Sequence, residues 1–229
     1  TYKPYIRTTP PGRPWVQLNG EGWRPLVTWD LDLWRGQFGP KVVPDKYKVK
    51  LIVDNQEFIR ELVVLKDPKS EGTIEDIKLQ VETLIELRDA MNLAVNMINT
   101  IEVVRSELDS IIPQLKNKND IEKAQSLSKA AQSIAGSLYD IHLTGAREDA
   151  FRYPMQLYGR LSALASDLSG HGIDFKPTNQ QKEVQAIFNK RLKVVEEKFQ
   201  KFITKEVSEL NTQLKKSKLK IETEKKIKM

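Results

Sequence analysis

The chain has no cysteine and only two histidines among its 229 residues. The absence of cysteine excludes disulfide bonds, thiolate metal sites and cysteine nucleophiles. It does not identify a compartment, because exported bacterial proteins and cytosolic proteins can both lack cysteine. His142 and His171 have no cysteine and no paired-carboxylate spacing around them. We therefore predict that neither histidine binds a metal or belongs to a catalytic triad.

Short catalytic and phosphate-binding motifs are also absent from the sequence. It has no glycine-rich phosphate loop, no Gly-x-Ser-x-Gly elbow and no His-Glu-x-x-His zinc motif. Neighbouring carboxylates such as Glu196 and Glu197 are flanked by lysine, which is typical of a solvated helix face. We predict no catalytic, cofactor-binding or metal-binding residue in this chain.

Long hydrophobic runs are lacking as well. No apolar stretch approaches the roughly 20 residues that a transmembrane helix needs, so we predict no transmembrane segment. The sequence starts at Thr1 without the basic and apolar regions of a signal peptide. This start is expected for a mature or excised chain.

The positive charge of the chain is concentrated at one end. The net charge is +6, and residues 215–229 hold seven lysines and two glutamates, which gives 7 − 2 = +5 and leaves 6 − 5 = +1 for the rest. This segment has no arginine or aromatic residue, unlike a nucleic-acid-binding surface. We predict a solvated basic tail and no nucleic-acid partner.

The composition divides the chain into two parts. Residues 1–66 contain all four tryptophans, whereas residues 73–214 are rich in leucine, isoleucine, glutamate, lysine and alanine. Residues 67–72 contain Asp-Pro and Ser-Glu-Gly and are predicted to be a linker. The two parts predict an α+β chain with a tail at 215–229.

The first part is predicted to contain the last strands of an antiparallel β-sandwich of immunoglobulin or fibronectin type. Tyr47, Val49, Leu51 and Val53 alternate as in a half-buried strand, and a turn near residues 54–56 leads to a return strand from Phe58 to about residue 65. About four strands fit into residues 1–66, whereas such a sandwich has about seven. The expected sandwich is therefore partial, and upstream sequence or another chain must complete it.

The second part is predicted to be an antiparallel four-helix bundle. The first helix begins after Thr73, whose spacing to Asp76 is that of a capping box, and it extends to about residue 112. The second is capped by Asp120 and ends near residue 143, the third runs from about 155 to 169 after Pro154, and the fourth follows Thr178. Each has an apolar stripe at helical spacing, so the four helices can bury one another.

The order of several short motifs resembles a known family. These are Trp-Asp-Leu at 29–31, Gly-Pro-x-Val-x-Pro at 39–44 and Asp-Pro at 67–68, followed by Leu-Arg-Asp at 87–89, Arg-Tyr-Pro at 152–154 and Pro-Thr at 177–178. This order is similar to the C-terminal region of bacterial secreted, sortilin-type BNR/Asp-box β-propeller proteins that are glycosyl-hydrolase-like. The family has glycine where this chain has Asp45, and aspartate tolerates such a turn better than most residues.

The resemblance implies a secreted, periplasmic or cell-surface location. It also implies an upstream β-propeller and further sandwich strands, in the same protein or in a separate chain, and protein partners in a larger assembly. Asp30 lies in the Trp-Asp-Leu motif of the family, and we expect it to be structural because no second acid or base accompanies it.

The four tryptophans allow two interpretations. Trp15, Trp23, Trp29 and Trp34 fall within 20 residues and can pack in a core or at the seam between the two parts. Alternatively, Trp15, Trp23 and Trp34 form a face for a ligand or a partner.

The function expected from the sequence is that of a non-catalytic, C-terminal structural and interaction region. The alternatives are an accessory part of an active glycoside hydrolase that helps to line a glycan-binding cleft, and a free-standing helical adaptor.

Overall fold

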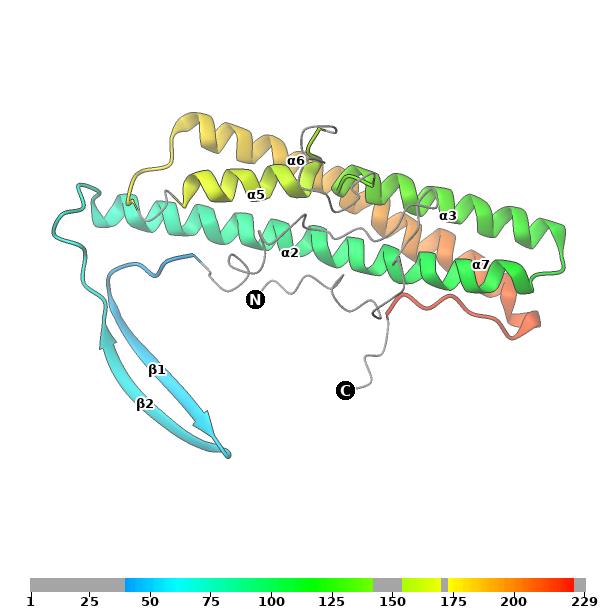
Figure 1. Cartoon of the computed structure of the whole chain (residues 1–229), viewed down its shortest axis with the longest axis horizontal. Helices are drawn as coiled ribbons and strands as arrows, with labels where there is room; N and C mark the ends of the chain where they lie inside the picture. The colour runs from blue at the N-terminus through cyan, green and yellow to red at the C-terminus, as the bar shows by residue number, and fades with distance from the viewer. Residues whose placement is uncertain (1–39, 142–153, 170–172, 225–229) are drawn as a thin grey trace.

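The computed structural model describes residues 40–141, 154–169 and 173–224. These residues form one β-hairpin and a helical body that is much larger than the hairpin (Figure 1). The predicted N-terminal strands before residue 40, including the Trp-Asp-Leu motif, lie outside the described residues.

The hairpin consists of β1 (Lys46–Val53) and β2 (Gln56–Val63), which pair in antiparallel register from Lys46↔Val63 to Val53↔Gln56. Asp54 and Asn55 form the two-residue turn, with φ of 48° and 64°. Positive φ at both positions is the geometry that matches the right-handed twist of the strands, and aspartate and asparagine tolerate it. The predicted turn and return strand are confirmed.

The prediction of a partial β-sandwich is wrong. In the described part of the chain the only sheet has two strands, and no second sheet faces it. Val42 and Val43, in the Gly-Pro-x-Val-x-Pro motif, precede β1 and are separated from it by Pro44 and Asp45. Between residue 40 and the first helix the chain forms this one hairpin, and two strands cannot enclose a sandwich core, so the observed architecture is a helical body with an attached hairpin.

The first helix, α2 (Ile74–Ile111), begins as predicted. Thr73 accepts a hydrogen bond from the Asp76 backbone N–H, and Asp76 accepts one from the Thr73 backbone N–H. At about 1.5 Å per residue, α2 is about 57 Å long. It ends in a 3₁₀ turn, η2 (Ile112–Gln114), which contains Pro113.

The next two helices differ from their predicted bounds. α3 (Lys118–Leu138) is capped by Asn117, whose side chain accepts from the Asn119 N–H, so Asp120 lies in its first turn instead of at its cap. α5 (Leu157–Leu168) begins three residues after Pro154. Both Asn117 and Asp120 are good cap residues, and the sequence did not distinguish between them.

The last helical run extends from residue 179 to residue 217. It comprises α6 (Asn179–Lys201), a π-helical segment η4 (Phe202–Val207), α7 (Ser208–Leu214) and a 3₁₀ turn η5 (Lys215–Ser217). The capping box of Thr178 and Gln181 is confirmed. The wider π turn explains the five-residue step between two buried residues, Phe202 and Val207, and it keeps Glu206 out of the core.

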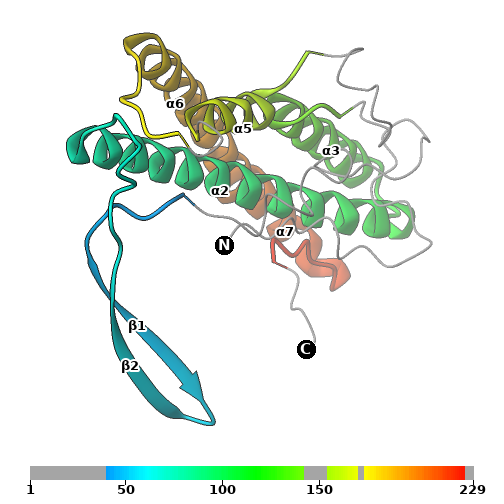
Figure 2. The same ribbon diagram turned by 60° about the vertical axis from the view of Figure 1, so that its left-hand side comes forward.

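The helices lie side by side along α2 (Figures 1 and 2). α3 and α5 both run antiparallel to α2 and follow one another along it, and α6 returns in the direction of α2. The Gln80 amide of α2 donates to the Leu168 carbonyl of α5 at 2.8 Å, and the Gln185 amide of α6 donates to the Glu86 carboxylate at 2.8 Å. The four predicted helical runs are thus present.

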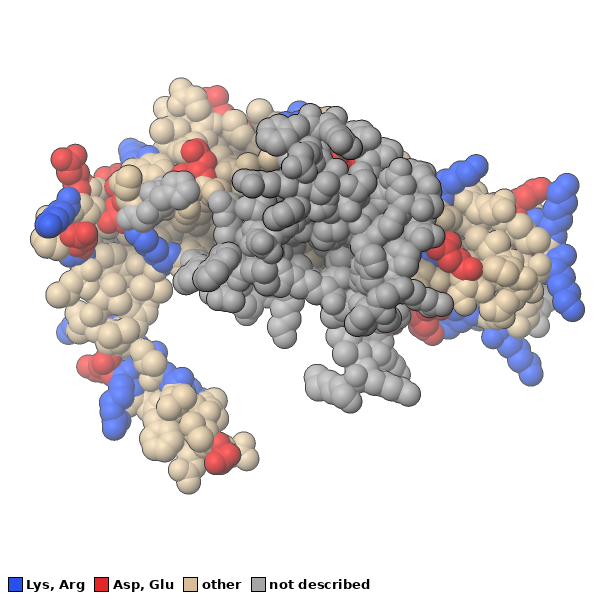
Figure 3. Space-filling model, in the orientation of Figure 1, with Lys and Arg blue, Asp and Glu red and all other residues tan. Residues whose placement is uncertain are grey.

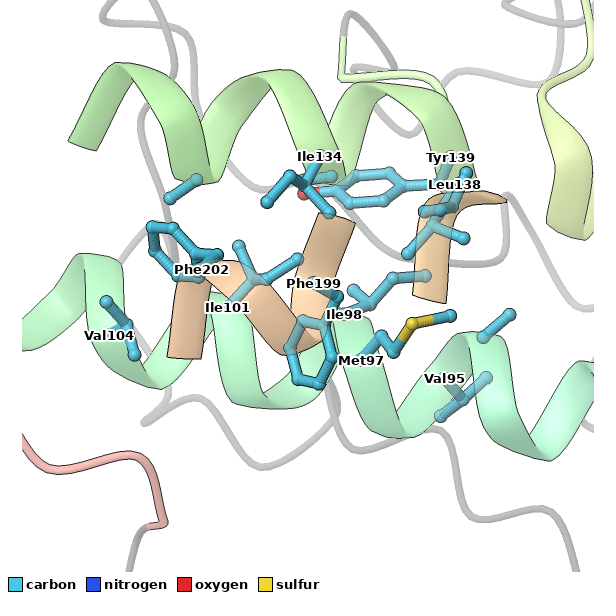
Figure 4. Close-up of a cluster of buried hydrophobic side chains, with 14 of the residues drawn as sticks. Val95, Met97, Ile98, Ile101, Val104, Ile134, Leu138, Tyr139, Phe199 and Phe202 are labelled. Carbon is cyan, nitrogen blue, oxygen red and sulfur yellow. The ribbon is translucent and has the colours of Figure 1, made fainter. Parts of the chain in front are cut away.

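The core of the body lies where α2, α3 and α6 meet (Figure 4). Ile98, Ile101 and Leu138 have no exposed surface, and Phe202 is 1% exposed. The close-up labels core side chains from α2, from α3 and its C-cap, and from α6 and η4: Val95, Met97, Ile98, Ile101, Val104, Ile134, Leu138, Tyr139, Phe199 and Phe202. This core is complete without the hairpin.

The prediction of a solvated tail from residue 215 is wrong for its first part. Ile221 is 1% exposed, and Leu219 packs against the core. Asn211 holds this segment, since its side-chain oxygen accepts from the Ile221 N–H at 2.7 Å and its amide donates to the Ile221 carbonyl at 2.9 Å. Lys218, with φ of 56°, turns the chain back toward α7.

Candidate interaction surface

The two faces of the hairpin differ in chemistry. Residues that pair directly across an antiparallel ladder point to the same face. The apolar face, as we name it, therefore carries Tyr47, Val49, Leu51, Val53, Phe58 and Leu62, together with Gln56 and Arg60. The charged face carries Lys46, Lys48, Lys50, Glu57 and Glu61, together with Ile52, Ile59 and Val63. Lys50 and Glu57 form an ion pair on the charged face.

The apolar face has no partner within the described residues. Leu51 is 57% exposed, Phe58 is 47% exposed and Leu62 is 49% exposed. The hairpin extends away from the helices (Figures 1 and 2), and in the space-filling view it stands apart from the helical body (Figure 3). An isolated two-stranded hairpin is marginally stable in water. Exposed apolar surface of this kind is typical of an interaction site.

The base of the hairpin is attached to the helical body. Lys41 forms an ion pair with Asp174 at 3.8 Å. A Cβ added to Gly72 would lie 2.9 Å from the Asp174 carbonyl oxygen, so the close approach of these two segments requires glycine. Between β2 and α2, Asp67 accepts hydrogen bonds from the backbone N–H groups of Lys69 and Ser70. These contacts fix the start of the hairpin relative to α2.

A buried polar cluster joins α2 to the end of α3. The Arg105 guanidinium donates to the Glu102 carboxylate at 3.1 Å, and the Tyr139 hydroxyl donates to the same oxygen at 2.8 Å. The side chains of Arg105 and Glu102 are 3% and 11% exposed. Burial raises the pKa of Glu102, and the charge of Arg105 and the hydrogen bond from Tyr139 oppose that rise. Burial also raises the pKa of Asp109, again opposed by Arg105.

This cluster has the properties of a structural ion pair. Its charged groups are buried and paired with one another, and among the described residues no group of three or more histidine, aspartate or glutamate side chains could hold a metal ion. This ion pair was not predicted from the sequence, although Arg105 follows Ile101 by four residues and precedes Leu108 by three, which is a core position of α2. That spacing was the available signal.

The residues that the sequence analysis singled out are not placed by the structure. Trp15, Trp23 and Trp34 lie outside the described residues, as does Asp30. The same is true of His142 and His171, which belong to the segments 142–153 and 170–172. In the described part of the chain, no helix combines the length and the apolar character that a membrane span requires.

Comparison with known proteins gives no relative. No protein-family model matches the chain, and no curated protein and no solved structure matches it either.

Proposed function

We propose that this chain is a non-catalytic structural and interaction region of a larger protein. The observation that carries the proposal is the apolar face of the hairpin, which is half exposed while side chains of the same types are buried in the helical body. The body supports the hairpin, and the hairpin makes the contact.

The energetics favour a docked hairpin. Fully burying a large apolar side chain is worth about 1.5–3 kcal/mol, so covering a half-exposed one is worth about 1 kcal/mol. The apolar face has six such side chains, and Tyr47 alone is partly held by its own segment, where its hydroxyl donates to the Val43 carbonyl at 2.6 Å. Docking on a complementary surface would therefore stabilise the hairpin by several kcal/mol.

The occupant that we propose for the apolar face is the upstream part of the same protein. That part is tethered through residues 1–45 to the start of β1, so its effective concentration at the hairpin is raised without any further contact. The contacts of Lys41 and Gly72 with Asp174 orient the hairpin relative to the body. The motif order in the sequence associates the larger protein with sortilin-type propellers and with a location outside the cytoplasm.

The absence of cysteine provides a direct test of this proposal. Phe58→Cys and Leu62→Cys each introduce the sole thiol of the chain on the apolar face, and Lys48→Cys introduces one on the charged face as a matched control. The rate of alkylation of each thiol is measured in this 229-residue chain and in a longer gene product that includes upstream sequence.

We expect the thiols introduced at positions 58 and 62 to react roughly tenfold or more slowly in the longer protein, with little change at position 48, because a docked face must open before it reacts. Equal rates in the two proteins would overturn the proposal. Protection that instead increases with the concentration of the shorter chain would also overturn it, since the occupant would then be a second copy.

A further inference from the structure

We propose that the open edge of β1, formed by Lys48, Lys50 and Ile52, binds an extended segment of a partner protein as an added antiparallel strand. The segment has acidic side chains at alternate positions and apolar side chains between them. The proposed site is the backbone edge of the hairpin, so it is separate from the apolar face of the proposed function.

The open edge presents backbone groups that β2 does not use. The Val64 N–H donates to the Asp45 carbonyl at 2.9 Å, so the hydrogen-bonded pairs of the ladder continue at every second residue of β1. The N–H and C=O groups of Lys48, Lys50 and Ile52 lie between these pairs and point away from β2. Among the described residues, no strand and no side chain forms a hydrogen bond with them. Such an edge is a template for an added strand.

The opposite edge of the hairpin is partly closed by one of its own side chains. The carbonyl of Ile59 points outward from β2, because Ile59 and Lys50 face one another without mutual hydrogen bonds. The Arg60 guanidinium donates to this carbonyl at 2.9 Å. A strand added to β2 would have to break that hydrogen bond. The edge that is ready to pair is therefore that of β1.

The side chains along the open edge select the chemistry of the partner. Lys46, Lys48 and Lys50 lie on the charged face along β1. Lys50 pairs with Glu57, whereas Lys46 and Lys48 form no ion pair with a described residue. Opposite charges directly across a strand pair stabilise it, and like charges destabilise it. An acidic residue opposite each lysine places the alternate residues of the added strand beside the apolar face, where apolar side chains fit.

The same lysines disfavour a second copy of this chain at the open edge. Charged side chains, lysine above all, commonly prevent the edges of identical sheets from pairing. Two copies of β1 would bring lysine against lysine. The β2 edge of a second copy carries acidic residues, but its Ile59 carbonyl already accepts from Arg60. Pairing of that edge with β1 would also be head to tail, which leaves a free edge at each end of the assembly.

The test is an NMR titration of the intact 229-residue chain with a synthetic peptide. The probe is Val-Glu-Val-Glu-Val-Glu-Val with blocked ends. We expect saturable shifts of the amide signals of Lys48, Lys50 and Ile52, and little change at Glu57 and Glu61, which report the other edge. The matched control Val-Lys-Val-Lys-Val-Lys-Val should bind roughly tenfold or more weakly. No binding of the acidic peptide, or equal binding of the two, would overturn the proposal.

Methylation of the peptide backbone separates strand pairing from attraction between charges. In the antiparallel pairing the N–H groups of the glutamates point to β1, because these residues lie opposite the lysines whose own groups point outward. Methylating the glutamate nitrogens should weaken binding roughly tenfold or more, whereas methylating the valine nitrogens should change it by less than about threefold. Equal effects of the two methylations would overturn strand pairing. The reverse pattern would overturn the antiparallel orientation.

Charge reversal in the chain tests the two lysines that have no ion pair. Lys46→Glu/Lys48→Glu should lose the acidic peptide and bind the lysine peptide instead. The control Lys190→Glu/Lys193→Glu makes the same change in net charge at exposed positions of α6 and should leave both affinities unchanged. Undiminished binding of the acidic peptide to the reversed variant would overturn the role of the lysines. The methylated peptides are tested on the original chain, so they decide the pairing even if a charge variant loses the hairpin.

Two further readouts keep this proposal distinct from others. If the amide signals of the open edge shift with the concentration of the chain alone, a second copy occupies the edge and the proposal is overturned. Alkylation at positions 58 and 62, on β2, tests the proposed function separately. The peptide can bind the edge whether or not upstream sequence covers the apolar face, so one proposal can fail while the other stands.

Discussion

Side chains of the same type are buried in the helical body and half exposed in the hairpin. Phe202 is 1% exposed and Phe58 is 47% exposed, while Leu138 has no exposed surface and Leu51 is 57% exposed. Both regions follow the apolar spacing of their secondary structure, with every third or fourth residue in the helices and every second residue in the strands. The same residue types are thus buried where helices pack together and remain half exposed where two strands have no described partner.

The largest expected effect separates the two regions with one substitution. Phe202→Ala should lower the free energy of unfolding by about 3–5 kcal/mol, the usual cost of removing a buried aromatic ring. Phe58→Ala should lower it by about 1 kcal/mol or less, because the ring is already half exposed. Urea unfolding followed by circular dichroism measures both. Similar losses in the two variants would show that the Phe58 ring is as well packed as the Phe202 ring, which would contradict the difference between hairpin and body.

The buried ion pair gives the next test of the core. Glu102→Leu leaves the Arg105 guanidinium buried without its partner and should cost about 3–5 kcal/mol. The triple variant Glu102→Leu/Arg105→Met/Tyr139→Phe removes all three polar groups and should recover most of this loss, because apolar replacements of a buried pair are often neutral. Urea unfolding of the two variants checks this. If the triple variant were no more stable than Glu102→Leu, the loss could not be assigned to an unpaired Arg105, and the polar cluster itself would stabilise the body.

The docked part of the tail should contribute a smaller amount. Ile221→Ala removes a side chain that is 1% exposed and should cost about 2–4 kcal/mol. Lys220→Ala, at the adjacent exposed position, is the control and should be within about 0.5 kcal/mol of the original chain. Thermal unfolding distinguishes the two. An unchanged stability for Ile221→Ala would mean that the tail adds nothing to the body.

The pH dependence of stability is the smallest expected effect. A carboxyl whose pKa is raised in the folded chain binds its proton more tightly there than in the unfolded chain. The stabilising contribution of Glu102 is therefore fully present below its ordinary pKa of 4.5 and is lost as the pH rises through its folded-state pKa. Glu102→Gln cannot titrate, so the unfolding free energy of the original chain minus that of the variant should decrease from pH 4.5 upward. A difference that increases with pH would reverse the assigned direction.

The features that the sequence predicted correctly are local. The capping boxes at Thr73 and Thr178 and the turn at residues 54–56 each depend on residues within a few positions of one another. Alternation in the strands also predicted the apolar face. Local patterns define an element and its apolar side.

The features that the sequence did not predict depend on distant contacts. Strand alternation is the same whether or not a second sheet covers the apolar face. It therefore predicts a strand with an apolar side but cannot predict a sandwich. The docking of Ile221 depends on Asn211, ten positions away, and on a turn at Lys218. The buried Arg105 depends on Tyr139, at the end of another helix.

The most direct test of the account is native-state hydrogen exchange of the intact chain across increasing, sub-denaturing urea concentrations. The central claim is that the helical body carries the stability and the hairpin is a weakly stabilised element held for docking. The amides of Ile98 and Ile101 in α2 should exchange only through global unfolding, whereas those of Leu51 and Phe58 should exchange through local opening at a clearly lower free energy. If the hairpin amides instead exchanged only with global unfolding, the hairpin would be an integral part of the folded body, and the account would be contradicted.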